Sequence, residues 1–311
     1  MPTSLTADAN IAELVQRFRD NALGVVLFLL VEDYESRFLQ AYRRLGFDDV
    51  RRSHGAVLRH LDGRGATMSL LSQRAGLTKQ TIGKIVRQLE QLGYLTVAVS
   101  ADDRRARLVR ISARGEQLVS ASNRVVETIR RHYRQRLGEA AFDALYRQLD
   151  RATRELGVQP RYDSSPQRFL HFGRLLVELA GDFERRLFAV LPTGAQAILN
   201  RPVITQLYQL GQGGMTISEL AQPQALTVQA VSLTVRQMAA RGLVSVRECH
   251  GDSRAKRVAL SPAGQVLLGQ LGDGCAGVRA DYARVLGADT LSAMELSLRN
   301  LHDALREPSP A

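Results

Sequence analysis

The sequence lacks tryptophan and has only two cysteines, and only three of its 42 basic residues are lysines. Two cysteines, Cys249 and Cys275, exclude a disulfide scaffold, and we expect them to be reduced, inert thiols. The longest apolar run, Ala22–Val31, is shorter than the roughly 20 residues of a membrane-spanning helix. Acidic residues precede this run and no small-residue cleavage site follows it, which argues against a secretory signal. We therefore expect a cytoplasmic protein with no membrane partner.

The sequence patterns of an enzyme or a metal protein are also absent. There is no Gly-x-Ser-x-Gly motif, no Walker loop and no Gly-x-Gly-x-x-Gly motif. The six histidines show neither paired metal-ligand spacing nor a neighbouring cluster of cysteines or acids. We therefore expect no catalytic residues, no metal and no cofactor.

Acidic residues are too few to balance the basic ones, so the formal net charge is +11. A positive excess favours polyanionic partners through counterion release, although basic proteins without a nucleic-acid partner also exist. A division after Pro160 gives 26 basic and 18 acidic residues in the first part, against 16 and 13 in the second. With 45% hydrophobic residues and a length of 311, the chain is expected to form about two globular domains, the first more basic than the second.

The chain contains an internal repeat with an offset of 149 residues. Thr67–Leu118 aligns without a gap with Thr216–Leu267, and 19 of the 52 aligned pairs are identical. A period of this length matches a whole domain, so we expect two copies of one fold. Glycine, proline and serine interrupt the helical patterns at residues 157–166. The predicted domains are therefore residues 1–158 and 159–311.

Each copy has the pattern of a helix-turn-helix. In the first copy, Ser69–Ala75 is typical of a short helix, and Thr78 is the expected N-cap of a second helix, Lys79–Leu92. Apolar residues of the second helix recur with the helical period, which predicts one buried face and one polar face. The equivalent helix of the second copy begins after Thr227.

Two short strands follow this helix in each copy. In the first copy Gly93 can end the helix, and Tyr94–Val99 and Leu108–Ile111 then predict a hairpin with a basic tip. In the second copy the hairpin is expected within Val246–Val258. A helix, a turn, a second helix and a basic hairpin together predict a winged helix-turn-helix.

Long helical patterns flank each module. Exposed on a single winged helix, their apolar residues would form large patches, so we expect them to pack against each other across the two copies. The predicted fold is therefore mainly α with small β-hairpin wings (α+β), in which two winged helix-turn-helix domains form an intramolecular pseudo-dimer through long dimerisation-type helices. These segments are Asn10–Leu45, Ala113–Leu156, Gln167–Val190 and Pro262–Arg306.

The sequence around each wing carries a family resemblance. The first copy reads Leu89-Glu-Gln-Leu-Gly-Tyr-Leu95 and then Asp103-Arg-Arg-Ala-Arg-Leu-Val-Arg-Ile-Ser112. The second copy has Asp252-Ser-Arg-Ala at the equivalent place. This pattern resembles the multiple antibiotic resistance regulator (MarR) family, and the chain resembles two such subunits fused in tandem.

The resemblance implies a transcription regulator that places one recognition helix per subunit in the major groove and a wing arginine in the minor groove. It also implies that a small, often aromatic or phenolic ligand weakens DNA binding in many members. By the wing motif, Arg105 and Arg254 correspond to the minor-groove arginine, while Asp103 and Asp252 correspond to the acid that orients the wing. On physical grounds, an arginine on a hairpin tip can enter a narrow minor groove, where negative potential is concentrated.

We expect the exposed face of each recognition helix and the tip of each wing to contact DNA. The alternative is a solvated helix face and a basic hairpin balanced by its own acids. In the first copy the candidate residues are Thr78, Lys79, Gln80, Gly83, Lys84 and Arg87, with Asp103, Arg104, Arg105 and Arg107 in the wing. In the second copy they are Thr227, Gln229, Ser232 and Arg236, with Asp252, Arg254 and Lys256 in the wing.

Two further points remain open from the sequence. Val228 and Leu233 replace Lys79 and Lys84 in the second copy, so its helix either touches thymine methyl groups or has lost specific reading and serves as a scaffold. A basic group before the first helix-turn-helix either reaches phosphate or is a solvated helix start; its members are Arg51, Arg52, His54 and Arg59.

The sequence as a whole predicts a sequence-specific regulator of transcription that binds double-stranded DNA. We expect a repressor, a monomer that acts as a pseudo-dimer on an imperfect palindrome and is released by a small ligand. The alternative is a module of the same fold that binds a ligand or a protein and reads DNA weakly or not at all.

Overall fold

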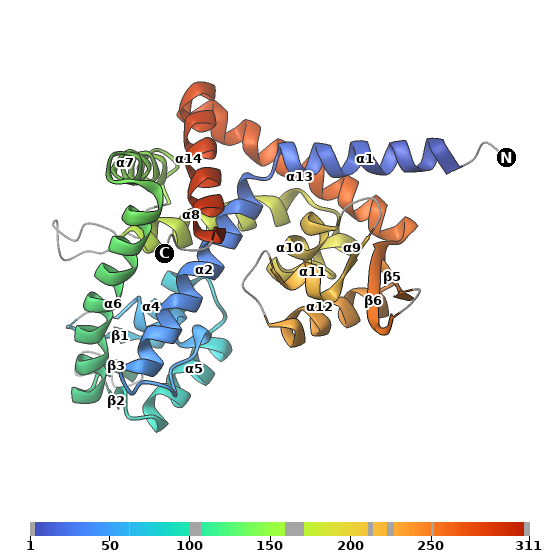
Figure 1. Ribbon diagram of the computed structural model, residues 1–311. Coiled ribbons are helices and arrows are strands. Elements are labelled where there is room, and N and C mark those ends of the chain that lie inside the picture. Colours follow the sequence, from blue (N-terminus) through green and yellow to red (C-terminus); the bar gives the residue numbers. More distant parts are fainter. Residues whose placement is uncertain are drawn as a thin grey trace. The chain divides into compact units, whose positions relative to one another are not determined.

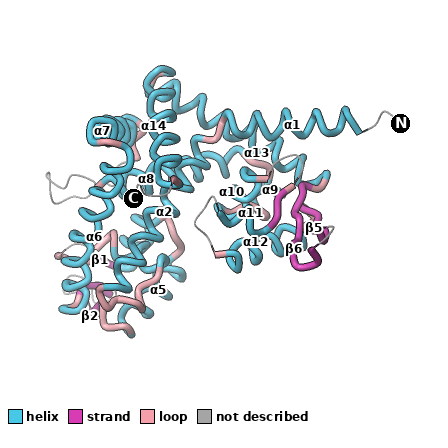
Figure 2. The backbone as a smooth tube through the Cα atoms, in the orientation of Figure 1, coloured by secondary structure: helices cyan, strands magenta, loops and turns pink. Residues whose placement is uncertain are grey.

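A computed structural model describes residues 4–61, 63–99, 107–158, 171–210, 214–222, 227–249 and 252–307, and side chains are described from residue 11 onward, except at 249 and 252–255. The chain divides into two compact units (Figure 1). One unit is Tyr34–His132, and the other combines Met1–Asp33 with Tyr133–Ala311. Most of the chain is helical, and the strands form two small separate sheets (Figure 2).

The unit Tyr34–His132 is a winged helix-turn-helix. Its sheet is antiparallel, in the order β1-β3-β2, with Ala66 opposite Val109 and Leu95 opposite Ile111. The elements are the second half of α2 (Leu23–Arg44), η1 (Arg52–His54), α3 (Gly55–Leu58), β1 (Ala66–Thr67), α4 (Met68–Ala75), α5 (Lys79–Gln91), β2 (Leu95–Val99), β3 (Arg107–Ile111) and most of α6 (Ala113–Leu137).

Local sequence explains where α4 and α5 begin and end. Thr67 and Thr78 are their N-caps, and each side chain accepts a hydrogen bond from the backbone amide three residues later. Gly76 ends α4 in the left-handed conformation, and Gly93 follows α5 with φ of 79°. The expected bounds of both helices and of the hairpin are confirmed to within one residue. The buried face of α5 consists of Ile82, Ile85, Val86 and Leu89.

The second unit contains another winged helix-turn-helix together with helices from both ends of the chain. Its sheet has the order β4-β6-β5, which repeats the order of the first sheet. The remaining elements are α1 (Ser4–Asp20), the first half of α2, α7 (Glu139–Glu155), α8 (Phe172–Val190), α9 (Thr193–Gln196), α10 (Arg201–Gln209), β4 (Met215–Thr216), α11 (Ile217–Ala221), α12 (Val228–Ala240), β5 (Val244–Cys249), β6 (Asp252–Leu260), α13 (Pro262–Leu286) and α14 (Ala288–Arg306).

Three of the long helical patterns are interrupted, which the sequence analysis did not predict. The first breaks between α1 and α2 at residues 21–22, and the others break at Gly138 and Gly287. These two glycines have φ of 87° and 85°, a backbone conformation that residues with a Cβ rarely adopt, so one helix ends and a new one begins. Each glycine is the N-cap residue of the helix that follows it.

Helices from both sequence copies share one core in the second unit. α7 packs against α8, α13 and α14, and α1 lies along α13. The ring centroids of Phe142 on α7 and Phe172 on α8 are 4.7 Å apart. Flanking helices of the two copies therefore pack together within this unit. The predicted domain boundary between residues 158 and 159 separates the two sequence copies, not the two compact units, and it stays a prediction.

The same tyrosine–aspartate hydrogen bond occurs twice in this core, at positions related by the offset of 149. The Tyr133 hydroxyl donates to Asp33 at 2.6 Å, and the Tyr282 hydroxyl donates to Asp182 at 2.7 Å. Asp182 is only 2% exposed and also accepts hydrogen bonds from Arg185 and Arg186. Burial and the nearby Asp182 carboxylate raise the pKa of Tyr282 above its ordinary value.

Among the described residues, no helix has both the length and the apolar character that a membrane crossing requires.

Candidate nucleic-acid interface

The outward face of α5 carries the candidate residues of the first copy. Lys79, Gln80, Lys84 and Arg87 are all exposed, whereas Gly83 is half-buried. Thr78 holds the start of the helix, because its hydroxyl oxygen accepts a hydrogen bond from the Thr81 amide at 3.2 Å. The buried face of α5 lies opposite these residues, so the long polar side chains extend into solvent.

These cations have no acidic partner among the residues that the structure describes. In the part of the chain that the structure describes, no carboxylate forms an ion pair with Lys79, Lys84 or Arg87. Several acids of this unit pair elsewhere: Glu35 with Arg52 at 3.1 Å, Asp49 with Arg114 at 2.8 Å and Glu127 with Arg130 at 2.8 Å. An unpaired, solvated row of cations on a helix is suited to bind a polyanion.

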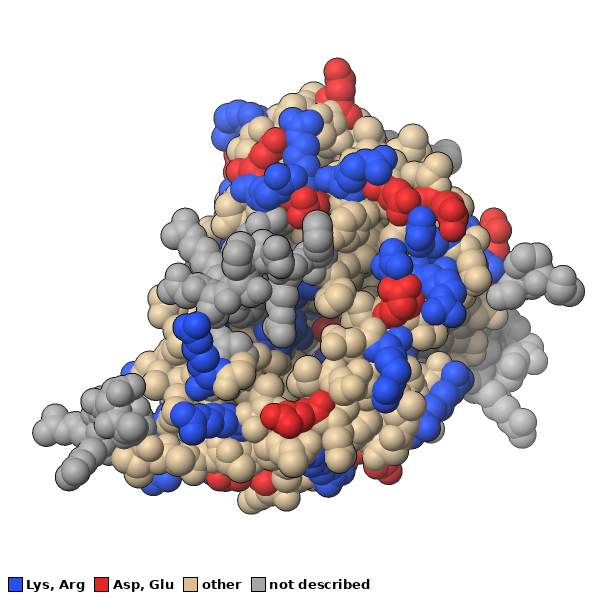
Figure 3. Space-filling model, turned by 90° about the vertical axis from the view of Figure 1, so that its left-hand side faces the viewer, with Lys and Arg blue, Asp and Glu red and all other residues tan. Residues whose placement is uncertain are grey.

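The wing stands next to α5 in the sequence and adds two exposed cations. Arg107 and Arg110 are exposed on β3. Asp103, Arg104 and Arg105, the predicted wing tip, lie outside the described residues. On the face shown in Figure 3, lysine and arginine side chains lie at many separate places, with acids between them.

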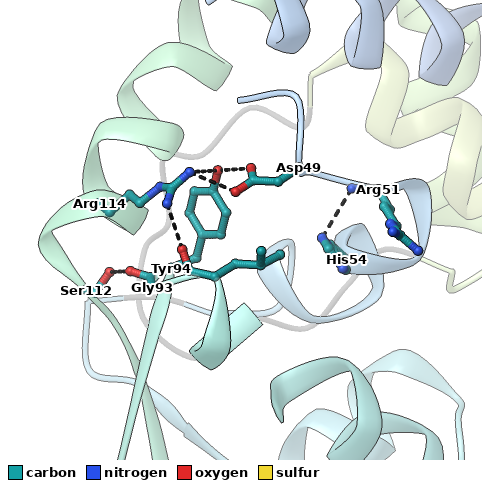
Figure 4. A network of polar contacts seen from close by, with 8 residues as sticks. Asp49, Arg51, His54, Gly93, Tyr94, Ser112 and Arg114 are labelled. Atoms are coloured by element: carbon teal, nitrogen blue, oxygen red, sulfur yellow. Dashed lines mark hydrogen bonds and ion pairs between the residues drawn. The ribbon is translucent and has the colours of Figure 1, made fainter. Parts of the chain in front are cut away.

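A polar network fixes the end of α5 to the strand and helix that follow (Figure 4). The Tyr94 hydroxyl donates to Asp49 at 2.5 Å, and Arg114 donates both to Asp49 at 2.8 Å and to the Leu92 carbonyl at 3.0 Å. Ser112 donates to the Gly93 carbonyl at 2.5 Å. Burial and the hydrogen bond to Asp49 raise the pKa of Tyr94 to about 12. The network thus joins α5, the wing and α6 into one rigid support.

Sequence reasoning missed most of this network. The serine had a signal, because Ser112 and Ser261 are an identical pair of the repeat, and Ser261 likewise donates to the Gly242 carbonyl. Asp49 and Arg114 had no such signal in the repeat, because the equivalent residues, 198 and 263, are isoleucine and alanine.

The basic group before the helix-turn-helix belongs to the scaffold. His54 is 1% exposed, and its Nδ1 accepts a hydrogen bond from the Arg51 amide at 3.2 Å. Burial lowers the pKa of His54, which favours the neutral ring. Arg52 and Arg59 both pair with Glu35. Neither expectation for this group, phosphate contact or a solvated helix start, describes the buried His54.

The equivalent helix of the second copy, α12, is capped in the same way but differs in its exposed face. The Thr227 side chain accepts a hydrogen bond from the Ala230 amide at 3.2 Å. Gln229 and Arg236 are exposed and Ser232 is half-buried. Val228 and Leu233 are 52% and 54% exposed. One cation on this face thus replaces the three of α5.

The second wing is described in part. Asp252 and Arg254 lie in β6, but their side chains are outside the described part of the chain. Lys256 is exposed and lies opposite Glu248 in the sheet. Arg257 donates to the Gly214 carbonyl at 3.0 Å, which holds it against the start of β4.

Chemistry other than polyanion binding has little support in the described residues. Burial raises the pKa of the Cys275 thiol to about 12, so the thiolate that redox reactions need is disfavoured. The Cys249 side chain is not among those that the structure describes. Among described residues, no group of three or more histidine, cysteine, aspartate or glutamate side chains is placed to hold a metal ion.

Part of the chain is similar to known proteins. Residues 48–106 match the model of the MarR family, a family of transcription regulators rather than enzymes. No curated protein matches the chain. Among solved structures, a mutant of S. aureus MepR bound to an oligodeoxyribonucleotide is 19% identical, with a TM-score of 0.29 over 40% of this chain and 90% of that one. The family match covers the first helix-turn-helix and β2, the first strand of its wing, and ends before β3.

Proposed function

We propose that this protein is a transcription regulator that binds double-stranded DNA in a sequence-specific manner through α5 and the wing that follows it. The observation that carries the proposal is the exposed row Lys79, Gln80, Lys84 and Arg87, which has no acidic partner among the described residues, on a capped and rigidly supported helix. The match of residues 48–106 to a family of transcription regulators supports it.

The dimensions and chemistry of α5 suit the major groove of DNA. The helix has 13 residues and is therefore about 20 Å long, and the major groove admits an α-helix. Gln80 can read adenine by two hydrogen bonds, and Lys84 and Arg87 can read guanine or neutralise phosphate. Arg105 and Arg107 of the wing reach the adjacent minor groove or its phosphates.

The finer form of the proposal assigns one DNA-binding surface to each sequence copy. The chain then acts as a monomeric pseudo-dimer on an imperfect palindrome whose half-site centres are about 34–36 Å apart, one helical turn of DNA. The sequence repeat supports this, as do the equivalent caps at Thr78 and Thr227 and the shared core of flanking helices. Fusion makes the second contact intramolecular, which raises its effective concentration.

Repression, with release by a small ligand, is the regulatory mode that we propose from the family resemblance. A ligand acts in this way only if it binds the DNA-free conformation more tightly than the DNA-bound one. A competing function, a binding module that reads DNA weakly, is favoured by one observation: Val228 and Leu233 are more than half exposed on α12. A comparison of the affinities for upstream DNA and for random DNA separates the two functions.

The test measures the affinity of the full chain for its own upstream DNA and for a random duplex of equal length, over a series of salt concentrations. For Lys84→Ala with Arg87→Ala, we expect loss of the preference for the upstream DNA. The slope of log affinity against log salt concentration should become less steep by about 1 for each of these two residues that contacts phosphate.

The matched control is Arg131→Ala. Arg131 is an exposed arginine of the same unit, about 27 Å along α6 from the wing by the helical rise, so its removal should leave the preference unchanged. Equal affinity of the unaltered protein for the two duplexes at physiological salt would refute the proposed function and favour the competing one.

A further inference from the structure

We propose that Leu233 makes α12 a reader of thymine methyl groups, so that the two half-sites of the operator differ at one central base pair. This inference rests on the proposed function, because it names the base that the second surface recognises. It also chooses between the two roles that the sequence leaves open for α12, a methyl reader and a scaffold.

Leu233 occupies the centre of the outward face of α12. At 100° per residue, Gln229 lies 40° from Leu233 on one side, at i−4, and Arg236 lies 60° away on the same side, at i+3. Lys84 has the same neighbours in α5, namely Gln80 and Arg87. The two helices therefore present the same glutamine and arginine. At the centre of the face leucine replaces lysine, and at the start of the helix Val228 replaces Lys79.

The exposure of Leu233 is not a consequence of core packing. The buried face of α12 is already formed by Val231, Val235 and Met238, which are at most 2% exposed. Leu233 is 54% exposed, so most of its apolar surface remains in contact with water. Covering that surface with another apolar group releases water and is favourable.

The surroundings of Leu233 favour DNA over an apolar protein partner. Arg236 on the same helix and Arg247 and Lys256 on the wing strands are exposed cations, which suit phosphates on either side of a groove. A leucine and a valine form a smaller apolar area than a stable protein interface requires. The thymine C5 methyl is the apolar group that the major groove offers, and no other base carries one.

The predicted operator is therefore asymmetric in a specific way. The base that Gln80 reads in one half-site and the base that Gln229 reads in the other should be the same. The base next to it should differ. In the half-site that α5 binds, Lys84 should contact a guanine or a phosphate, and in the half-site that α12 binds, Leu233 should contact a thymine.

The test uses the duplex that the full chain selects from a random pool, with the thymines of one half-site at a time replaced by deoxyuridine. Deoxyuridine keeps the hydrogen-bonding edge of thymine and lacks only the methyl group. We expect an affinity loss of about fourfold for each methyl that Leu233 covers, the factor that corresponds to burying one methylene. The loss should occur in one half-site only.

Leu233→Ala should abolish that difference between thymine and deoxyuridine, while the effect of salt on affinity stays the same. Leu296→Ala is the matched control, because Leu296 is 61% exposed on α14 of the same unit and should leave the difference intact. Since both leucines are exposed, neither change removes a core contact, and circular dichroism verifies that both variants are folded.

Several outcomes overturn the inference. A selected motif with two identical half-sites, or one without thymine in either half, contradicts the asymmetry. A duplex whose affinity is unchanged by deoxyuridine, or changed equally in Leu233→Ala, contradicts the role of Leu233 while the proposed function stands. Recovery of no motif refutes the proposed function, and the inference with it.

Discussion

The buried pair Tyr282 and Asp182 allows a quantitative test of the helical core, because the chain contains a second copy of the same hydrogen bond. Tyr282→Phe removes one hydrogen bond to a carboxylate that is only 2% exposed. The phenylalanine ring can keep the edge-to-face contact with Phe183, whose centroid is 6.0 Å away, and the position 5.6 Å beneath the Arg186 guanidinium. The change therefore isolates the hydroxyl group.

The expected cost follows from the burial of the acceptor. A hydrogen bond to a charged group contributes about 1.5–3 kcal/mol, and a buried acceptor that loses a donor cannot turn to water. Tyr282→Phe should therefore lower the free energy of unfolding by about 2 kcal/mol. In the other copy Asp33 is half-buried, so water can replace the hydroxyl, and Tyr133→Phe should cost about 1 kcal/mol or less.

Urea unfolding followed by circular dichroism measures both variants in the same compact unit, so the two losses are directly comparable. The m-value should stay unchanged, and the midpoint should shift more for Tyr282→Phe than for Tyr133→Phe. If the two variants lost the same stability, or if Tyr133→Phe lost more, the argument from acceptor burial would be refuted.

Two further predictions concern the unit Tyr34–His132. Gly115→Ala should destabilise it by about 1–3 kcal/mol in thermal unfolding, because a Cβ there would overlap the Tyr94 carbonyl oxygen; a stabilising effect would contradict the close approach of α6 to Tyr94. Gly83→Ala should instead stabilise it by up to about 1 kcal/mol, because a Cβ there would meet only the Arg87 side chain, at 3.6 Å. The pKa of Tyr94, raised to about 12, means that the folded state holds this proton more tightly than the unfolded state. Its contribution to stability should be complete below about pH 10 and lost as the pH rises from 10 to 12, and Tyr94→Phe should flatten this alkaline decline in a pH series of urea unfolding.

Sequence reasoning located the helix-turn-helix well because its signals are local. Thr78 has a short polar side chain that caps a helix, and Gly93 adopts the left-handed conformation that ends one, so both bounds of α5 follow from neighbouring residues. The 3.6-residue period then separated Ile82 and Leu89, which are buried, from Lys84 and Arg87, which are exposed.

The features that the sequence did not predict depend on residues far apart in the chain. Asp49 meets Arg114 across 65 positions, and neither has a counterpart in the repeat. Gly138 and Gly287 lie in continuous apolar patterns, so periodicity alone predicted one helix where the backbone forms two. His54 resembles part of a basic surface in the sequence, but packing buries it.

Selection of bound duplexes from a random pool tests whether α5 reads DNA. The selection is carried out in parallel with the unaltered chain, with Lys84→Ala and Arg87→Ala combined, and with Arg131→Ala. We expect the unaltered chain and Arg131→Ala to enrich the same motif, and the α5 double variant to lose the half-site of α5. Enrichment of the full motif by the double variant, or of no motif by the unaltered chain, would contradict this expectation.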